Sequence, residues 1–139
     1  LKLALVARAK ACGLYTESVK VKLPLGSKKR YYYPAVVLTS FPNDGDRRTV
    51  ENPCLVVEVL SESTANIDRI EKLETYQRIA SIQQYVLVDQ SRRKLEVYSR
   101  HKDKWIYEML EAGQFEVACL ETTMTIDEVY AGLDFEVKQ

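Results

Sequence analysis

A carboxylate inside an apolar segment is the first sign of chemistry in this sequence. Residues 55–60 read LVVEVL, so Glu58 stands between Val57 and Val59 in an otherwise apolar run. Such a run is typical of a strand buried on both faces. A carboxylate there must reach solvent at a sheet edge, pair with a cation or bind a metal, because burying an isolated charge is very costly. From the strand alone, a structural ion pair and a functional carboxylate both stay open.

The helix predicted after this strand carries a cation and a second carboxylate. A short Ser/Thr-rich connection leads into residues 66–79, where apolar side chains recur at helical spacing. Asp68, Lys72 and Tyr76 recur every four residues and form one stripe beside that apolar face. A strand, a short loop and a helix in this order can aim Lys72 and Asp68 back at Glu58. The alternative is a solvated ion pair between Asp68 and Lys72.

The remaining elements predict one α/β domain over residues 1–139. Apolar alternation and β-branched or aromatic runs predict strands at residues 15–23, 31–39, 85–89, 95–98, 105–110 and 115–120. The last four should form an antiparallel meander. Helices are expected over residues 1–11 and, after a capping box at 125–128, through Tyr130, with an exposed loop over 41–52. Because residue 1 already lies in an amphipathic pattern, we expect residues to be missing before it.

Composition excludes several classes of protein. The 20 Lys and Arg residues balance 20 Asp and Glu residues, so binding of nucleic acid by bulk positive charge is excluded and any such binding must be local. The three widely spaced cysteines, Cys12, Cys54 and Cys119, are expected to be reduced core thiols, and a single histidine excludes a Cys/His zinc site. No apolar run approaches the roughly 20 residues that span a bilayer, so we expect no membrane partner and a cytoplasmic location.

Five motifs stand in order along the chain from about residue 14. They are residues 33–37 (YPAVV), 53–64 (PCLVVEVLSEST), 68–73 (DRIEKL) with Tyr76, 84–90 (QYVLVDQ) and 97–98 (VY). In type and spacing they resemble a bacterial restriction endonuclease family of the PD-(D/E)XK nuclease superfamily. The resemblance implies an α/β (α+β) fold of restriction-endonuclease type, with a mixed central β-sheet flanked by helices and an antiparallel C-terminal meander. It also implies Mg²⁺-dependent hydrolysis of DNA phosphodiester bonds, with Mn²⁺ as an alternative metal.

The resemblance assigns roles to four positions. In such nucleases carboxylates and a backbone carbonyl hold the metal, while a lysine orients the attacking water. Glu58 matches the metal-binding glutamate, and Val59 supplies the carbonyl. Lys72 matches a lysine that this family carries on the following helix. Asp68, one turn earlier, would fix the direction and charge state of Lys72.

One position departs from the family pattern. Ala35 stands where the family has a metal-binding aspartate, and a methyl group coordinates nothing. Its presence predicts weak or absent Mg²⁺ binding and impaired or absent cleavage. Glu17 is the expected substitute ligand, ahead of Asp44 and Asp46, because neighbouring antiparallel strands could bring it across from position 35.

Three functions therefore follow as hypotheses. The first is a Mg²⁺-dependent DNA endonuclease, impaired or inactive because of Ala35. The second is a non-catalytic module on the same fold that binds DNA or protein. The third is a regulatory homodimer formed through the exposed edge of the meander, because unpaired strand edges invite pairing.

Overall fold

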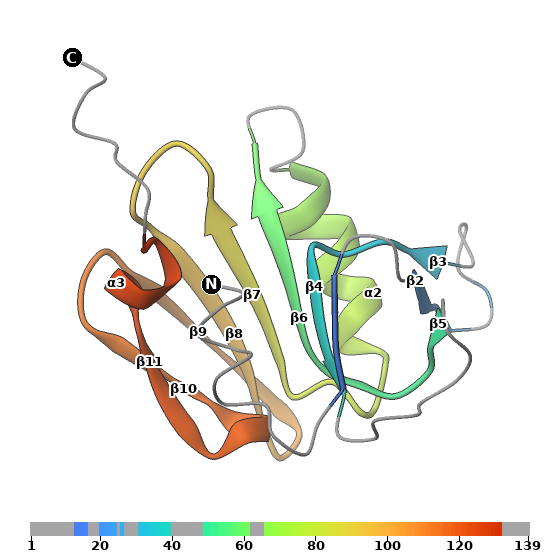
Figure 1. Cartoon of the computed structure of the whole chain (residues 1–139). Coiled ribbons are helices and arrows are strands. Elements are labelled where there is room, and N and C mark those ends of the chain that lie inside the picture. The colour runs from blue at the N-terminus through green and yellow to red at the C-terminus, as the bar shows by residue number, and fades with distance from the viewer. Residues whose placement is uncertain are drawn as a thin grey trace.

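A mixed β-sheet forms the centre of the computed structural model, which describes residues 13–16, 20–24, 26, 31–39, 49–61 and 66–131. Its strand order is β1-β4-β6-β7-β8-β9 (Figure 1). The bounds are Gly13–Thr16 for β1, Val36–Thr39 for β4, Pro53–Leu60 for β6, Gln84–Asp89 for β7, Leu95–His101 for β8 and Lys104–Leu110 for β9. The β6–β7 pair is parallel and the other neighbours are antiparallel. This arrangement confirms the mixed sheet, and β7, β8 and β9 form the first three strands of the expected antiparallel meander.

One helix provides the crossover that a parallel strand pair requires. It begins as a π-helix, η1 (Ile67–Lys72), and continues without a break as the α-helix α2 (Leu73–Gln77). These bounds agree with the helix predicted over residues 66–79. Lys72 lies at the junction of the two segments. In the described part of the chain, no helix is long and apolar enough to cross a membrane.

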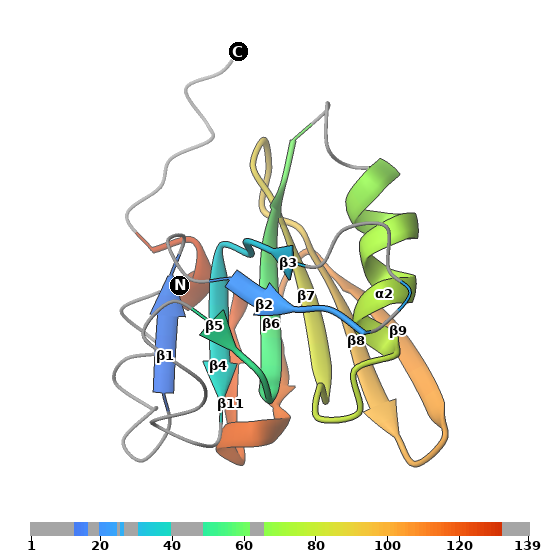
Figure 2. The same cartoon turned by 90° about the vertical axis from the view of Figure 1, so that its right-hand side faces the viewer.

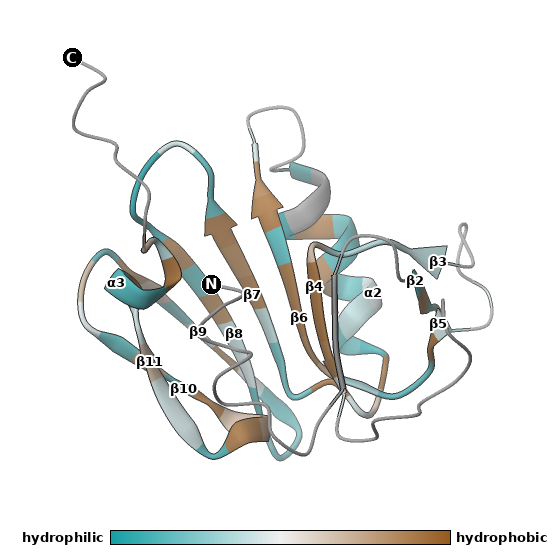
Figure 3. Cartoon of the chain, viewed as in Figure 1, coloured by the Kyte–Doolittle hydropathy of each residue, from teal (hydrophilic) through white to brown (hydrophobic). Residues whose placement is uncertain are grey.

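Both faces of the central sheet are covered, which explains the nearly continuous apolar runs of its inner strands. The helix and a small sheet of strands β3-β2-β5 cover one face; these strands span Tyr31–Tyr32, Lys20–Lys22 and Thr49–Val50. The other face packs against β10 (Gln114–Val117), β11 (Thr122–Thr125) and α3 (Ile126–Val129). Figure 1 shows the two covering layers on either side of the sheet, and Figure 2 shows the sheet face on. In Figure 3 the hydrophobic colour runs along β4, β6 and β7, between these layers.

Three strand predictions are corrected by the structure. Residues 15–23 contribute to two strands in different sheets, β1 and β2. Residues 31–39 are divided between β3 and β4, and Pro34, which lacks a backbone N–H for a ladder, lies in the break. The strand expected at 115–120 ends at Val117 and pairs with β11 in a separate hairpin, because Phe115 and Val117 face the core of the second face.

The capping box predicted at residues 125–128 is present in the structure. Thr125 Oγ1 accepts a hydrogen bond from the Glu128 N–H at 3.1 Å, and the Glu128 carboxylate accepts one from the Thr125 N–H at 3.0 Å. This reciprocal pair is the predicted capping box, and it begins α3. The helix expected at 1–11 and most of the loop expected at 41–52 lie outside the described residues.

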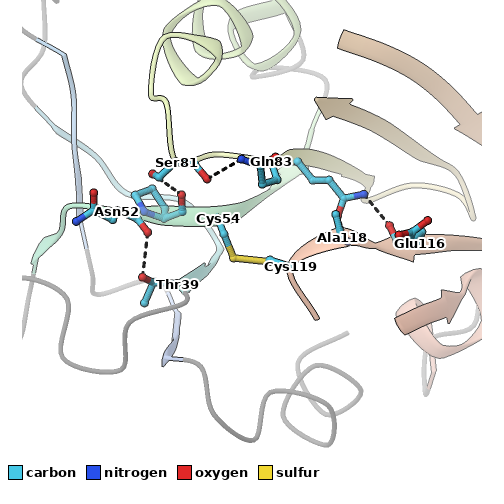
Figure 4. The surroundings of a disulfide bond; sticks show 10 residues. Thr39, Asn52, Cys54, Ser81, Gln83, Glu116, Ala118 and Cys119 are labelled. Carbon is cyan, nitrogen blue, oxygen red and sulfur yellow. Dashed lines mark hydrogen bonds between the residues drawn. A yellow bond between two sulfur atoms is a disulfide. The ribbon is translucent and has the colours of Figure 1, made fainter. Parts of the chain in front are cut away.

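The expected reduced thiols are wrong for two of the three cysteines. Cys54 of β6 and Cys119 of the 3₁₀ segment η2 (Ala118–Leu120) form a disulfide (Figure 4). Their Cα atoms are 6.2 Å apart, a separation that a disulfide spans. The apolar neighbours that suggested core thiols are those of a bridge between the buried Cys54 of the central sheet and the partly buried Cys119 in the segment after β10. Cys12 lies outside the described residues.

Candidate active site

The central contact of the site joins Glu58 to Lys72. The side chain of Glu58 in β6 points to the face of the sheet that the helix covers. The helix places Lys72 above it, so that Lys72 Nζ lies 3.0 Å from Glu58 Oε2. The Glu58 side chain is 7% exposed and the Lys72 side chain 20% exposed, so this is a largely buried ion pair. A buried carboxylate requires such a partner. The structure therefore brings together the two residues that the sequence singled out most strongly.

Two tyrosines complete the surroundings of this pair. The hydroxyl of Tyr76, one turn beyond Lys72, donates to the same Glu58 oxygen at 3.2 Å. Burial raises the pKa of Tyr76 well above its usual value, and the charge of Glu58 adds to the effect, so Tyr76 is a neutral donor. The ring of Tyr32 lies 5.5 Å from Lys72 Nζ, within reach of a cation–π interaction. The sequence alone indicated no role for either tyrosine at the site.

A second buried carboxylate on this face was missed by the sequence analysis. Glu96 of β8 is 5% exposed and accepts hydrogen bonds from Arg69 Nη2 at 2.7 Å and from the Tyr107 hydroxyl at 2.8 Å. A signal was present, because Glu96 stands between Leu95 and Val97 much as Glu58 stands between two valines. Only the tertiary contact with Arg69 shows that this carboxylate faces the helix.

The charge state of Glu96 follows from these partners. Burial alone would raise the pKa of Glu96, but hydrogen bonds from Arg69 and Tyr107 outweigh it and leave the pKa below its usual value. The same hydrogen bond to Glu96 raises the pKa of Arg69. Burial first, and then the hydrogen bond to Glu96 and its negative charge, raise the pKa of Tyr107 to about 12. The cluster is therefore a carboxylate held between a cation and a neutral phenol.

The remaining candidate residues are placed as follows. Ala35 lies in a bend before β4 and is partly buried against the core of the sheet face opposite the helix. Since Val36 pairs with Val57 in the antiparallel β4–β6 ladder, Ala35 and Glu58 are the next residues along their two strands. Val59 follows Glu58 in β6 with its side chain 44% exposed.

The other expected carboxylates fall where no side chain is described. Asp68 lies in η1, and its side chain is outside the described residues, as are Glu17, Asp44 and Asp46. Among the side chains that are described, no group of three or more His, Cys, Asp or Glu residues could hold a metal ion.

The oxygen ligands that the described residues offer could hold a Mg²⁺ ion only weakly. They are the Glu58 carboxylate, of which Oε2 already accepts from Lys72 and Tyr76, and the backbone carbonyl of Val59. Mg²⁺ takes oxygen ligands, retains several waters and can be held through one or two carboxylates. The set is therefore of the right chemical kind and is short of anionic ligands, because Ala35 supplies none.

A cavity of about 370 Å³ lies away from this cluster. It is lined by residues of β8, β9 and β10 and their neighbours, including Ser99, Glu108 and Phe115. The lining includes neither Glu58 nor Lys72, so the cavity is not part of the candidate site.

Comparisons with known proteins bear on the family and the fold of this chain. A model of the family described as "Uma2: Putative restriction endonuclease" matches residues 1–127. Two proteins of Synechocystis, both described as uncharacterized, are 30% identical over 118 residues and 33% identical over 101 residues. These matches cover 83% and 70% of this chain but 62% and 57% of the relatives, so the chain spans about three fifths of their length.

A solved structure agrees with the fold. The crystal structure of "a putative nuclease belonging to DUF820" from Anabaena variabilis is similar with a TM-score of 0.58 at 12% sequence identity. The similarity covers 92% of this chain and 73% of that chain, and at this identity it supports the fold alone. The family match and the fold agree with the resemblance carried by the sequence motifs. With residues 1–127 matched, the chain belongs to the Uma2 family of restriction-endonuclease-like proteins.

Proposed function

We propose that the Glu58–Lys72 face is a site for Mg²⁺-dependent hydrolysis of DNA phosphodiester bonds, and that Ala35 leaves it impaired. The observation that carries the proposal is the 3.0 Å contact between Lys72 Nζ and Glu58 Oε2 on the buried face of β6. Membership of a restriction endonuclease family supports the reaction class, and DNA is the corresponding substrate.

The chemistry divides between a metal and the side chains around it. Mg²⁺, or Mn²⁺, held by Glu58 and the Val59 carbonyl would activate a water and stabilise the leaving oxygen. Lys72 brings a positive charge to this place, and the Tyr32 ring beside it limits where its ammonium group can lie. Tyr76 remains protonated and holds one Glu58 oxygen in position. Lys72 is thus suited to orienting a water or a phosphate oxygen, and Asp68 remains a proposed support for it.

Ala35 explains why such a site would be impaired. The β4–β6 ladder ends at the Val36–Val57 pair, and position 35 is the next residue opposite Glu58, so an aspartate there would add a second carboxylate near Glu58 if its side chain turned to the helix-covered face. Without it the metal loses an anionic ligand, and loss of a metal ligand commonly costs orders of magnitude in rate. Glu17 stays the proposed substitute from elsewhere in the chain.

The test is to restore the carboxylate. Titration calorimetry with Mg²⁺ and Mn²⁺ and a plasmid-nicking assay would compare the chain with Ala35→Asp. We expect tighter metal binding and faster nicking in the variant, and loss of both when Glu58→Gln is added. Glu74→Gln, an exposed helix position, is the matched control and should change neither. An Ala35→Asp protein that folds normally and gains neither property would contradict the proposal.

The second candidate is a non-catalytic DNA-binding or protein-interaction module. The observation that favours it is that Lys72 already balances the charge of Glu58, so the fold does not need a metal at this place. Fluorescence anisotropy with duplex DNA, in chelator and at several salt concentrations, separates the two. Salt-dependent binding without nicking in either protein would support the module.

A further inference from the structure

Strand β9 forms one edge of the central sheet. It pairs through all seven of its residues with β8, from Lys104 opposite His101 to Leu110 opposite Leu95. Among the described residues no strand pairs with its other side. Figure 2 shows the β8–β9 hairpin at the margin of the sheet. Such an edge presents backbone N–H and C=O groups that can pair with another strand.

The edge lacks three of the features that usually block such pairing. Proteins protect edge strands with prolines, bulges, very short strands or charged side chains, and of these β9 has only the charged side chains. The β8–β9 register is continuous, and β9 contains no proline. Three of its large apolar side chains are also exposed: Ile106 at 50%, Tyr107 at 51% and Met109 at 45%. The strand is therefore long and regular, and three large apolar side chains are among those that it exposes.

The two charges on this strand are arranged symmetrically. Lys104 and Glu108 are exposed and lie two residues before and two residues after Ile106, so all three side chains are on one face. An antiparallel copy related by a two-fold axis at Ile106 would place Lys104 of each strand opposite Glu108 of the other. Opposite charges at such cross-strand positions are favourable, whereas like charges are unfavourable.

The two neighbouring registers of this strand pair would be less favourable, because each places the apolar Ile106 opposite a charged side chain. An axis at Tyr107 would place Ile106 opposite Glu108, and an axis at Trp105 would place it opposite Lys104. The axis at Ile106 instead places the charged residues opposite each other. It also places Trp105 opposite Tyr107, so that aromatic side chains face aromatic side chains. Charge and apolar pattern therefore select the same register.

We propose that β9 pairs antiparallel with β9 of a second copy of this chain, about a two-fold axis at Ile106. The interface is isologous, and the central sheet becomes continuous through both copies. Tyr107, which donates to Glu96, faces Trp105 of the partner, so the interface adjoins the Glu96 cluster. This inference does not depend on the proposed nuclease function.

The test exchanges the charges of Lys104 and Glu108 and measures the effect on dimerisation. Light scattering with size-exclusion chromatography and sedimentation equilibrium should give twice the 16.0 kDa chain mass for the unaltered protein. Glu108→Lys and Lys104→Glu should each raise the dimer dissociation constant by about tenfold or more, since each places two like pairs across the axis. The double variant, with both exchanges, should restore the dimer. Glu74→Lys on the helix is the control and should leave the mass unchanged.

A mixing experiment identifies the register. Equimolar Lys104→Glu and Glu108→Lys proteins should form a heterodimer, because all four cross-strand charges are then complementary. Circular dichroism melts check that the variants fold, which is expected because both side chains are exposed. A monomeric unaltered protein at about 100 µM would overturn the proposal. A dimer indifferent to both single exchanges, or a mixture that fails to associate, would overturn it as well.

Discussion

Glu58 of β6 and Glu96 of β8 lie in one row of the central sheet, separated by Leu87 of β7. Each carboxylate is held by a basic side chain of the same helix, Lys72 for Glu58 and Arg69 for Glu96. Residues three apart on a helix point to neighbouring positions, so one turn delivers both cations. The helix is thereby attached to the sheet at two points, and the second attachment restrains the position of Lys72.

The Glu58–Lys72 pair should show strong energetic coupling. Lys72→Met removes the cation from a largely buried carboxylate, and we expect the free energy of unfolding to fall by about 3 kcal/mol. Glu58→Gln combined with Lys72→Met should cost clearly less than the sum of the two single changes. Urea denaturation of the four proteins measures the cycle. Additive losses would mean that the ion pair contributes little.

Glu96 should make stability depend on pH in the acid range. Its pKa is lowered in the folded protein, so its ionised form stabilises the fold above the ordinary pKa of 4.5. That contribution should be lost progressively as the pH falls below 4.5 and through the folded-state pKa. Compared by denaturation at several pH values, Glu96→Gln should be less stable at pH 7, with a deficit that shrinks toward pH 3. A deficit independent of pH would contradict the assignment.

Tyr107 should report the charge of Glu96 directly. Its pKa of about 12 reflects burial, the hydrogen bond to Glu96 and the negative charge of that carboxylate. In Glu96→Gln the charge is absent, so the pKa of Tyr107 should move down toward 10, and the phenolate should form at lower pH. Carbon-13 NMR of labelled tyrosine measures this titration, with Tyr107→Phe identifying the resonance. An unchanged pKa would show that burial alone sets it.

The disulfide should be detectable in the thiol count and in stability. Before reduction, the denatured chain should react as one thiol, and after reduction as three, because Cys54 and Cys119 are paired. The bridge joins residues 65 positions apart, and its reduction should lower the free energy of unfolding by about 2–4 kcal/mol. A Cys119→Ser protein should reproduce this loss and be insensitive to reductant. Three thiols in the unreduced chain would refute the pairing.

Local patterns in the sequence determined a large part of this protein. The apolar run around Glu58, the helical spacing after it and the capping box at Thr125 each depend on neighbours a few residues away, and each was predicted correctly. The short connection between this strand and the following helix limits how far the helix can lie from the end of β6. That constraint is why Glu58 and Lys72 could be expected to meet.

Tertiary structure alone decided what lies around that pair. Arg69 and Glu96 are 27 residues apart, and only the registers of β6, β7 and β8 place Glu96 in the row of Glu58. The division of residues 31–39 between two sheets and the pairing of Cys54 with Cys119 likewise depend on which distant strands supply the neighbours. Periodicity shows that a side chain is buried, but a contact partner is chosen by long-range packing, and no local pattern encodes that choice.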